Sequence, residues 1–295
     1  MLMTILDLIK KRNVLLDGGF GTELFKRGFP RGACLETWNV ERPEVVKEIH
    51  RSYFEAGSDA VMANSFGGNA IKLSSHGQEK RCYELNKAAA GIANEAKPEG
   101  GFVGGDIGPT GKFLRPQGEF TEAEFEEAFA EQARGLGDGK ADFLLIETQY
   151  DLREALCALR AARKVAAIPV FVSMTFNRVP RGFFTLMGNS VPDCLQELER
   201  EGVPAVGANC NLDSSDMADL VKVMRENTRL PLIAQANAGK PSLSSEGGVS
   251  YSQGMEDYLR HIPRIIENGA HIVGGCCGTD PEYIRRMAAI VKKED

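Results

Sequence analysis

Cysteine is the residue type in this chain of 295 residues whose number and spacing most strongly suggest a chemical function. Two of the seven cysteines, Cys276 and Cys277, are adjacent within the sequence Gly-Gly-Cys-Cys-Gly-Thr (274–279). An odd cysteine count in a chain of this length, with no secretion signal at its start, argues against a disulfide framework. We therefore expect a cytoplasmic protein with reduced thiols, in which clustered cysteines indicate metal binding or catalysis.

A third cysteine, Cys210, ends an apolar segment in Gly-Ala-Asn-Cys (207–210). Three thiolates around one Zn²⁺ would leave a tetrahedral position open, as in catalytic zinc sites, and soft thiolates suit this ion. Successive strand residues point to opposite faces, so Cys276 and Cys277 can share a metal only if the backbone bends. The glycines that flank the pair lower the cost of such a bend. Unrelated buried cysteines and a disulfide within the adjacent pair remain as alternatives.

Two further groups of polar residues follow apolar segments. Asp17, Gly18 and Gly19 begin Asp-Gly-Gly-Phe-Gly-Thr, where backbone N–H groups can approach an anion such as a substrate carboxylate. A tight turn explains the same three residues equally well. Glu147 follows a run of four apolar residues and is a candidate partner for a substrate ammonium, or for a nearby arginine.

The remaining candidates are weaker. Asp106 lies in a turn rich in glycine and proline, and we interpret it as an acceptor that shapes the loop rather than as a catalytic acid. Cys34 falls in a long loop from which it could approach the site, although we do not expect it to be a ligand. The other cysteines fall within helical patterns and are interpreted as packing residues: Cys82, Cys157 and Cys194.

Eight short apolar segments must position these residues. They read as continuous apolar runs, which is typical of buried parallel strands, and amphipathic helical patterns separate them. The predicted strands cover 14–21, 60–67, 102–109, 143–150, 170–176, 205–211, 232–239 and 271–279. The predicted helices cover 43–57, 121–137, 151–165, 191–202, 214–227, 255–269 and 280–293.

This alternation predicts a single (β/α)8 TIM barrel of parallel strands that occupies residues 1–295 as one domain. A short amphipathic helix is expected within residues 1–13, and long loops are expected at 25–39 and 240–250. An open doubly wound sheet fits the eight repeats less well. The carboxyl ends of barrel strands meet at one mouth, so the three cysteines, Asp17 and Glu147 should converge there. Asn237, which ends the seventh strand, should face the same mouth.

The charge balance excludes several partner classes. The chain carries 35 Lys and Arg against 41 Asp and Glu, which gives a net charge of −6. A nucleic acid or an anionic membrane surface requires a basic face, so we expect neither as a partner. No apolar run is long enough to cross a bilayer.

Taken together and in order, the three motifs at 17–22, 207–210 and 274–279 resemble those of the zinc-dependent homocysteine S-methyltransferase family. The resemblance extends from about Asn13 to Lys292. It implies that zinc is held by Cys210, Cys276 and Cys277. It also implies that the amino-acid group of L-homocysteine is held by Asp17, Gly18, Gly19 and Glu147.

The resemblance further implies a mechanism without catalytic residues beyond the zinc site. The substrate thiol would occupy the fourth ligand position of Zn²⁺ as a thiolate and attack an electrophilic methyl group, which gives methionine. A general base is unnecessary at the transfer step, because ligation to the metal has already displaced the proton. Asn237 would order the site, or fill the open zinc position before the substrate binds.

The methyl donor is the least determined part of this expectation. The segments at 105–111, 174–176 and 237–241 are similar to the homocysteine-binding module of cobalamin-dependent methionine synthase. The chain lacks that enzyme's folate and cobalamin modules and any Asp-x-His-x-x-Gly corrinoid signature. We therefore expect a methylcorrinoid (methylcobalamin) carried by a separate protein.

Three other hypotheses remain open. The chain could be a betaine- or S-methylmethionine-dependent homocysteine methyltransferase, with Trp38 and Tyr150 contributing to an aromatic cage for the cationic donor. It could be a non-catalytic thiol- or zinc-binding subunit of a corrinoid methyl-transfer complex. An unrelated barrel enzyme with a phosphate site at the last two strands is the fourth possibility.

Overall fold

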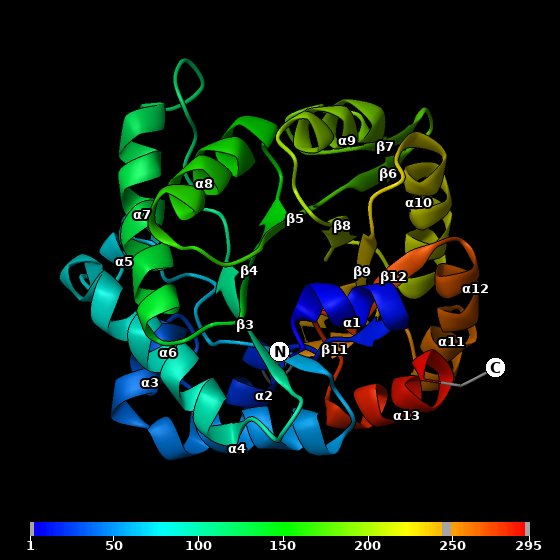
Figure 1. The fold of residues 1–295 in the computed structure, drawn as a ribbon, viewed down its shortest axis with the longest axis horizontal. Helices are drawn as coiled ribbons and strands as arrows, with labels where there is room; N and C mark the ends of the chain where they lie inside the picture. The colour runs from blue at the N-terminus through cyan, green and yellow to red at the C-terminus, as the bar shows by residue number, and fades with distance from the viewer. Residues whose placement is uncertain (1–2, 244–248, 293–295) are drawn as a thin grey trace.

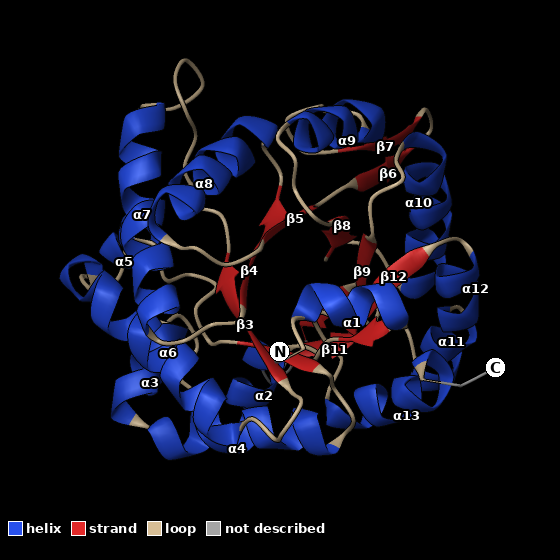
Figure 2. Cartoon of the chain, viewed as in Figure 1, coloured by secondary structure: helices blue, strands red, loops and turns tan. Residues whose placement is uncertain are grey.

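Eight parallel strands form a ring that helices surround, in a computed structural model that describes residues 3–243 and 249–292 (Figure 1, Figure 2). The neighbour order is β1-β12-β9-β8-β5-β4-β3-β2, and each neighbouring pair is parallel. These strands are β1 (Val14–Leu15), β2 (Ala60–Met62), β3 (Phe102–Ile107), β4 (Phe143–Gln149), β5 (Val170–Met174), β8 (Val206–Asn209), β9 (Leu232–Ala236) and β12 (Ala270–Gly275). The predicted (β/α)8 TIM barrel is confirmed.

The ring closes between β1 and β2 through two aspartates. The Asp59 N–H donates to Leu15 O at 2.7 Å, and the Leu15 N–H donates to Asp59 Oδ2 at 2.9 Å. Further along, the Met62 N–H donates to Asp17 Oδ2 at 2.8 Å. Side-chain oxygens thus accept N–H groups that would otherwise be buried without a partner at this seam.

The predicted helices are present, with one correction. The segment 255–269 forms two helices, α11 (Met255–Arg260) and α12 (Ile262–Glu267), because Pro263 lies in the first turn of α12 and cannot continue a preceding helix. The helices that pack around the barrel are α4 (Pro43–Glu55), α6 (Cys82–Ala96), α7 (Glu122–Asp138), α8 (Leu152–Val165), α9 (Val191–Arg200), α10 (Ser214–Asn227), α11, α12 and α13 (Pro281–Val291). Of these, α6 was not predicted, and its N-terminus has no side-chain cap to mark it.

The two expected long loops contain short elements. The segment 25–39 includes the end of α2 (Phe20–Lys26), a 3₁₀ turn (Leu35–Thr37) and the start of α3 (Trp38–Glu41). The segment 240–250 forms a hairpin of β10 (Pro241–Leu243) and β11 (Val249–Tyr251), and its residues 244–248 lie outside the described residues. A second hairpin, β6 (Asn177–Val179) with β7 (Gly182–Phe184), and the short α5 (Ala70–Ser74) complete the chain.

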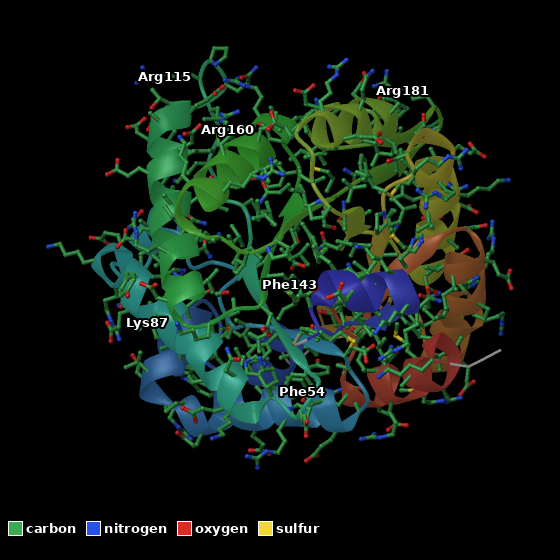
Figure 3. The ribbon with its side chains drawn as sticks, in the orientation of Figure 1. Phe54, Lys87, Arg115, Phe143, Arg160 and Arg181 are labelled. Carbon is green, nitrogen blue, oxygen red and sulfur yellow. The ribbon has the colours of Figure 1, made fainter. Side chains whose placement is uncertain are left out.

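The amino-terminal end of the barrel is covered by α1 (Ile5–Lys11), the expected short helix, which begins with a capping box between Thr4 and Asp7. Its residues Ile5, Leu8 and Ile9 pack against the interior side chains of the strands. Phe143, one of these interior residues, lies beside α1 near the centre of the ring (Figure 3). The site must therefore lie at the opposite, carboxyl end. No helix among the described residues is long and apolar enough to cross a membrane.

Candidate metal and substrate site

The sulfur atoms of Cys210, Cys276 and Cys277 all lie within 4.8 Å of one another. Cys210 follows β8 and the other two follow β12, so the predicted convergence of these strand ends is present. Three thiolates on one Zn²⁺ at about 2.3 Å in tetrahedral geometry need sulfur–sulfur distances of about 3.8 Å. The observed spacing fits such an ion with only small side-chain movements.

Backbone turns with positive φ bring the three sulfurs together. Cys210 adopts φ +61°, a conformation that non-glycine residues rarely adopt, and Gly278 adopts φ +85° directly after the cysteine pair. The Cys276 N–H donates to Ala236 O, and Cys277 O accepts the Ala238 N–H, both at 2.9 Å. Both cysteines of the pair are therefore attached to the end of β9, and the expected backbone bend is present.

Hydrogen bonds among the three cysteine side chains change their pKa values in opposite directions. The Cys210 thiolate accepts hydrogen bonds from the other two thiols, which lowers the pKa of Cys210 to about 3. Donation of these hydrogen bonds to Cys210 raises the pKa of Cys276 and the pKa of Cys277. A cluster that already stabilises one thiolate next to two more thiols has the donor chemistry of a soft-metal site.

Asn237, directly after β9, contacts Cys210 and also Cys277 of the adjacent pair. Its Oδ1 accepts the Cys277 N–H at 3.1 Å, and its Nδ2 lies 3.8 Å from Cys210 Sγ. The side chain is 4% exposed, so these contacts are formed away from water. The geometry favours a site-ordering role for Asn237, because its oxygen is already engaged by the backbone.

The Asp-Gly-Gly turn packs backbone to backbone against the turn that carries the cysteines. A Cβ on Gly18 would lie 2.7 Å from Thr279 O, and a Cβ on Gly19 would lie 2.8 Å from Cys276 O. The Gly19 N–H donates to Thr279 O at 2.8 Å, so this donor is not available to a substrate anion. The two glycines are thus required for close packing beside the sulfur cluster.

Three buried carboxyl groups line the same cavity as the sulfurs. Burial raises the pKa of Asp17 to about 8, although the hydrogen bond from Met62 N–H opposes this change. Burial and then the charge of Cys210 raise the pKa of Glu147 to about 8. Burial and the neighbouring carboxylates raise the pKa of Asp106 well above its usual range. Glu147 forms no ion pair with a Lys, Arg or His of the described residues, so the arginine alternative is wrong.

The sulfurs and carboxyls line one cavity of about 470 Å³ at the carboxyl end of the barrel. Its wall near the sulfurs includes Tyr251, on the β10–β11 hairpin, and Gln235. The outer wall is largely apolar and carries two cations at the rim. The residues of this outer wall are Phe20, Phe25, Lys26, Arg31, Leu35 and Phe66.

Sequence reasoning missed a set of hydrogen-bonded polar side chains that hold the site. Asn209 and Thr148 are hydrogen-bonded to each other between β8 and β4, and the Ser173 Oγ donates to Asn209 Oδ1 at 3.0 Å. The Thr279 Oγ1 donates to Cys276 O at 2.7 Å. Asn209 and Thr279 lie within the two cysteine motifs, and this position in the sequence was the available signal of their role.

Other candidates lie away from the cavity. Cys34 is buried and donates from Sγ to Glu36 Oε2, so it does not join the cluster. Trp38 is buried against Phe29, and Tyr150 packs beside Phe113; neither lines the cavity, so neither contributes the expected aromatic cage there. The three cysteines of the helical patterns are buried packing residues, as predicted: Cys82, Cys157 and Cys194.

Comparison with known proteins identifies the family that shares these features. The sequence model of the family described as homocysteine S-methyltransferase matches residues 14–291. Methionine synthase of Mycobacterium tuberculosis is 33% identical over 97% of this chain, and that of Mycobacterium leprae is 32% identical over 98%. The chain spans only 25% of the length of either relative.

Solved structures give the same fold. The homocysteine methyltransferase MmuM from Escherichia coli, in its metallated form, aligns with a TM-score of 0.80 at 23% identity, covering 96% of this chain and 98% of that chain. Its oxidized form aligns with a TM-score of 0.81 at 24% identity, covering 96% and 97% of the two chains.

Proposed function

The chain belongs to the homocysteine S-methyltransferase family, and from this premise we propose that it methylates the thiol of L-homocysteine to give methionine, with Zn²⁺ as its metal cofactor. The observation that carries the proposal is the cluster of three cysteine sulfurs within 4.8 Å of one another in the wall of a cavity. The 32–33% identity to methionine synthases supports the choice of substrate.

Cys210, Cys276 and Cys277 would hold the metal. Their spacing suits a tetrahedral ion with one open position, and their thiolate character suits Zn²⁺. When bound, the ion would act as a Lewis acid that stabilises a substrate thiolate at neutral pH, where a free thiol with a pKa near 8.5 is mostly protonated. Asn237 would hold two of the three cysteines in place.

The chain's own residues would bind and orient the amino-acid end of the substrate. We infer that Glu147, which has no cationic partner among the residues that the structure describes, accepts hydrogen bonds from the substrate ammonium. Asp17, Gly18 and Gly19 would form the adjacent wall of the cavity and contribute to holding the amino-acid group. Such orientation reduces the entropic barrier to transfer.

In the transfer itself, the substrate sulfur forms a bond to the methyl carbon. The bond between that carbon and the donor breaks, and its electron pair stays on the donor. No protein base is needed at this step once the substrate is a thiolate. The apolar outer wall of the cavity would exclude water from the reacting atoms.

We infer that the donor is a methylcorrinoid such as methylcobalamin, presented by a separate protein. The similarity to methionine synthases supports this choice over a betaine- or S-methylmethionine-dependent reaction. The position of Trp38 and Tyr150 outside the cavity removes one argument for a cationic donor.

A donor screen tests the proposal. The zinc-loaded chain is incubated with homocysteine and, separately, with methylcobalamin, betaine or S-methylmethionine, and methionine is quantified. Methionine formation with methylcobalamin, lost after dialysis against a chelator and restored by zinc, is the expected result. Homocysteine binding without turnover of any donor would indicate a non-catalytic subunit, and full activity without metal would contradict the zinc mechanism.

A further inference from the structure

The carboxyl group of Asp106 forms no hydrogen bond or ion pair with the residues that the structure describes. Asp106 lies on β3, lines the cavity and is 8% exposed. Its Oδ1 is buried and has no hydrogen-bond partner in the described residues. Buried polar atoms in native proteins nearly always have a partner, so a ligand is a natural explanation for one that does not.

The surrounding contacts rule out the loop-shaping role expected from the sequence. The Ser65 Oγ accepts the Asp106 N–H at 3.1 Å and donates to Asp106 O at 2.8 Å. The Gln132 Nε2 also donates to Asp106 O, at 3.3 Å. These bonds fix the backbone of this strand end entirely through main-chain atoms of Asp106, and they leave its carboxyl group unused.

The position of the Asp106 carboxyl group is unfavourable for the stability of the folded protein. Burial and the charges of Glu147, Asp17 and Glu36 all raise its pKa, and no Lys, Arg or His of the described residues forms an ion pair with it. A buried carboxyl without a partner destabilises the folded state. Such a cost at a cavity wall is typical of a site that is completed by a ligand.

Asp106 and Glu147 belong to neighbouring strands. In the β3–β4 register Asp106 is opposite Leu145 and Ile107 is opposite Ile146, so Glu147 lies one residue beyond the last pair. Both carboxyls line the same cavity at the carboxyl end of the barrel. An ammonium group has three N–H donors and can bond to two carboxyls at once.

We propose that Asp106 is a second substrate-binding carboxyl, which accepts a hydrogen bond from the α-ammonium of the thiol substrate together with Glu147. The inference rests on the proposed function and adds a determinant of specificity to it. It implies that the cavity selects thiols that carry an amino group over thiols of the same length that lack one, because only the former can donate hydrogen bonds to both carboxyls.

The test compares two thiols in direct binding to the zinc-loaded chain. Isothermal titration calorimetry measures the Kd of homocysteine and of 4-mercaptobutanoate, which is homocysteine without its amino group. For Asp106→Asn, the Kd of homocysteine should rise about 10- to 100-fold, the usual range for a lost charged hydrogen bond. The Kd of 4-mercaptobutanoate should stay within about twofold or fall, since this thiol has no ammonium to bind.

Two further measurements separate substrate binding from a structural role. The melting temperature of Asp106→Asn should stay unchanged or rise, because the substitution removes a buried carboxyl group that has no partner among the described residues, and the zinc content of the variant should not change. Asp142→Asn is the matched control: Asp142 precedes β4 at the opposite end of the barrel, where it pairs with Lys97 and the Val103 N–H. This variant should leave both Kd values unchanged.

The outcomes are distinguishable. Equal weakening of both thiols by Asp106→Asn, or no weakening of homocysteine, would overturn the role of Asp106 and leave the proposed function intact. Failure of the zinc-loaded wild type to bind homocysteine would overturn both. If Asp106→Asn fails to fold, Asp106→Ala replaces it in the same comparison, with the same expected selectivity.

Discussion

Thr148 on β4 and Asn209 on β8 are joined by two hydrogen bonds across the end of β5, which lies between their strands: the Thr148 N–H donates to Asn209 Oδ1 at 2.8 Å, and Asn209 Nδ2 donates to Thr148 Oγ1 at 2.7 Å. Each residue is adjacent in sequence to a candidate site residue, Glu147 in one case and Cys210 in the other. Thr148 adopts φ +57°, so this contact stabilises a backbone conformation that is unfavourable for threonine. The pair therefore fixes the carboxyl site and the sulfur site relative to each other.

Replacement of this asparagine should affect both sites. Asn209→Ala removes both bonds to Thr148 and leaves the partly buried Thr148 N–H without its acceptor, so the free energy of unfolding should fall by about 1–3 kcal/mol. Zinc affinity and homocysteine affinity should fall together. Urea unfolding, zinc titration and calorimetry measure the three effects. Loss of stability with both affinities unchanged would contradict the positioning role.

The sulfur cluster gives the sharpest prediction about the metal. Cys210→Ala removes one of three ligands and should abolish retention of zinc after dialysis, as measured by metal analysis. Cys157→Ala is the control, because Cys157 is buried in α8 away from the cavity. That variant should keep zinc while losing some stability from the cavity it creates. Equal zinc content in the two variants would rule out the proposed ligand set.

The close approach of the two turns predicts that a single methyl group disrupts the site. Gly19→Ala would place Cβ 2.8 Å from Cys276 O, so the backbone must shift, at a cost of about 1–3 kcal/mol in stability. Gly91→Ala, in the interior of α6, meets no atom within 4 Å and should instead stabilise the protein by about 0.5–1 kcal/mol. Thermal unfolding of both variants compares the effects, and the same sign for both would be evidence against the packing argument.

A buried histidine predicts the acid dependence of stability. Burial lowers the pKa of His50 from 6.5 to about 3, and its ring packs on Phe20 with both nitrogens unpartnered. Between these two values the His50 side chain binds a proton in the unfolded chain but not in the folded chain. The free energy of unfolding should therefore fall as the pH decreases from about 6.5 toward 3. The slope from this residue is at most about 1.4 kcal/mol per pH unit.

His50→Leu should flatten that part of the stability curve. Urea unfolding of the wild type and the variant at pH 7, 5 and 4 measures the difference, in which the titration of all other groups cancels. His76→Leu serves as the control, because His76 is exposed, and its curve should run parallel to that of the wild type. A His50→Leu curve that also runs parallel would show that His50 does not control acid stability.

The barrel was predictable because its strands are buried on both sides. Continuous apolar runs such as Phe143–Ile146 identify such strands, and the helices between them carry one apolar stripe each. The break at Pro263 and the hairpin of β6 and β7 were missed. At Pro263 a turn interrupts a helical pattern, and at β6 and β7 a turn pairs two short strands within an apparent loop. The hydrophobic pattern of the surrounding residues does not reveal either turn.

The candidate site was predictable to the extent that strand ends meet at one mouth. This rule brings Cys210 and the adjacent pair together without any knowledge of side-chain geometry. The rule does not tell which partner each polar group takes. The Gly19 N–H is engaged by Thr279 O, and the Asp106 carboxyl is left without a partner. Both depend on contacts between segments that are distant in sequence.

Asp17 belongs both to the cavity wall and to the seam that closes the ring, since its Oδ2 accepts the Met62 N–H between β1 and β2. Whatever occupies the cavity is therefore coupled to the integrity of the barrel at this one joint. We therefore expect the hydrogen–deuterium exchange rate of the Met62 amide to change when a ligand binds in the cavity, and this rate can be measured without turnover.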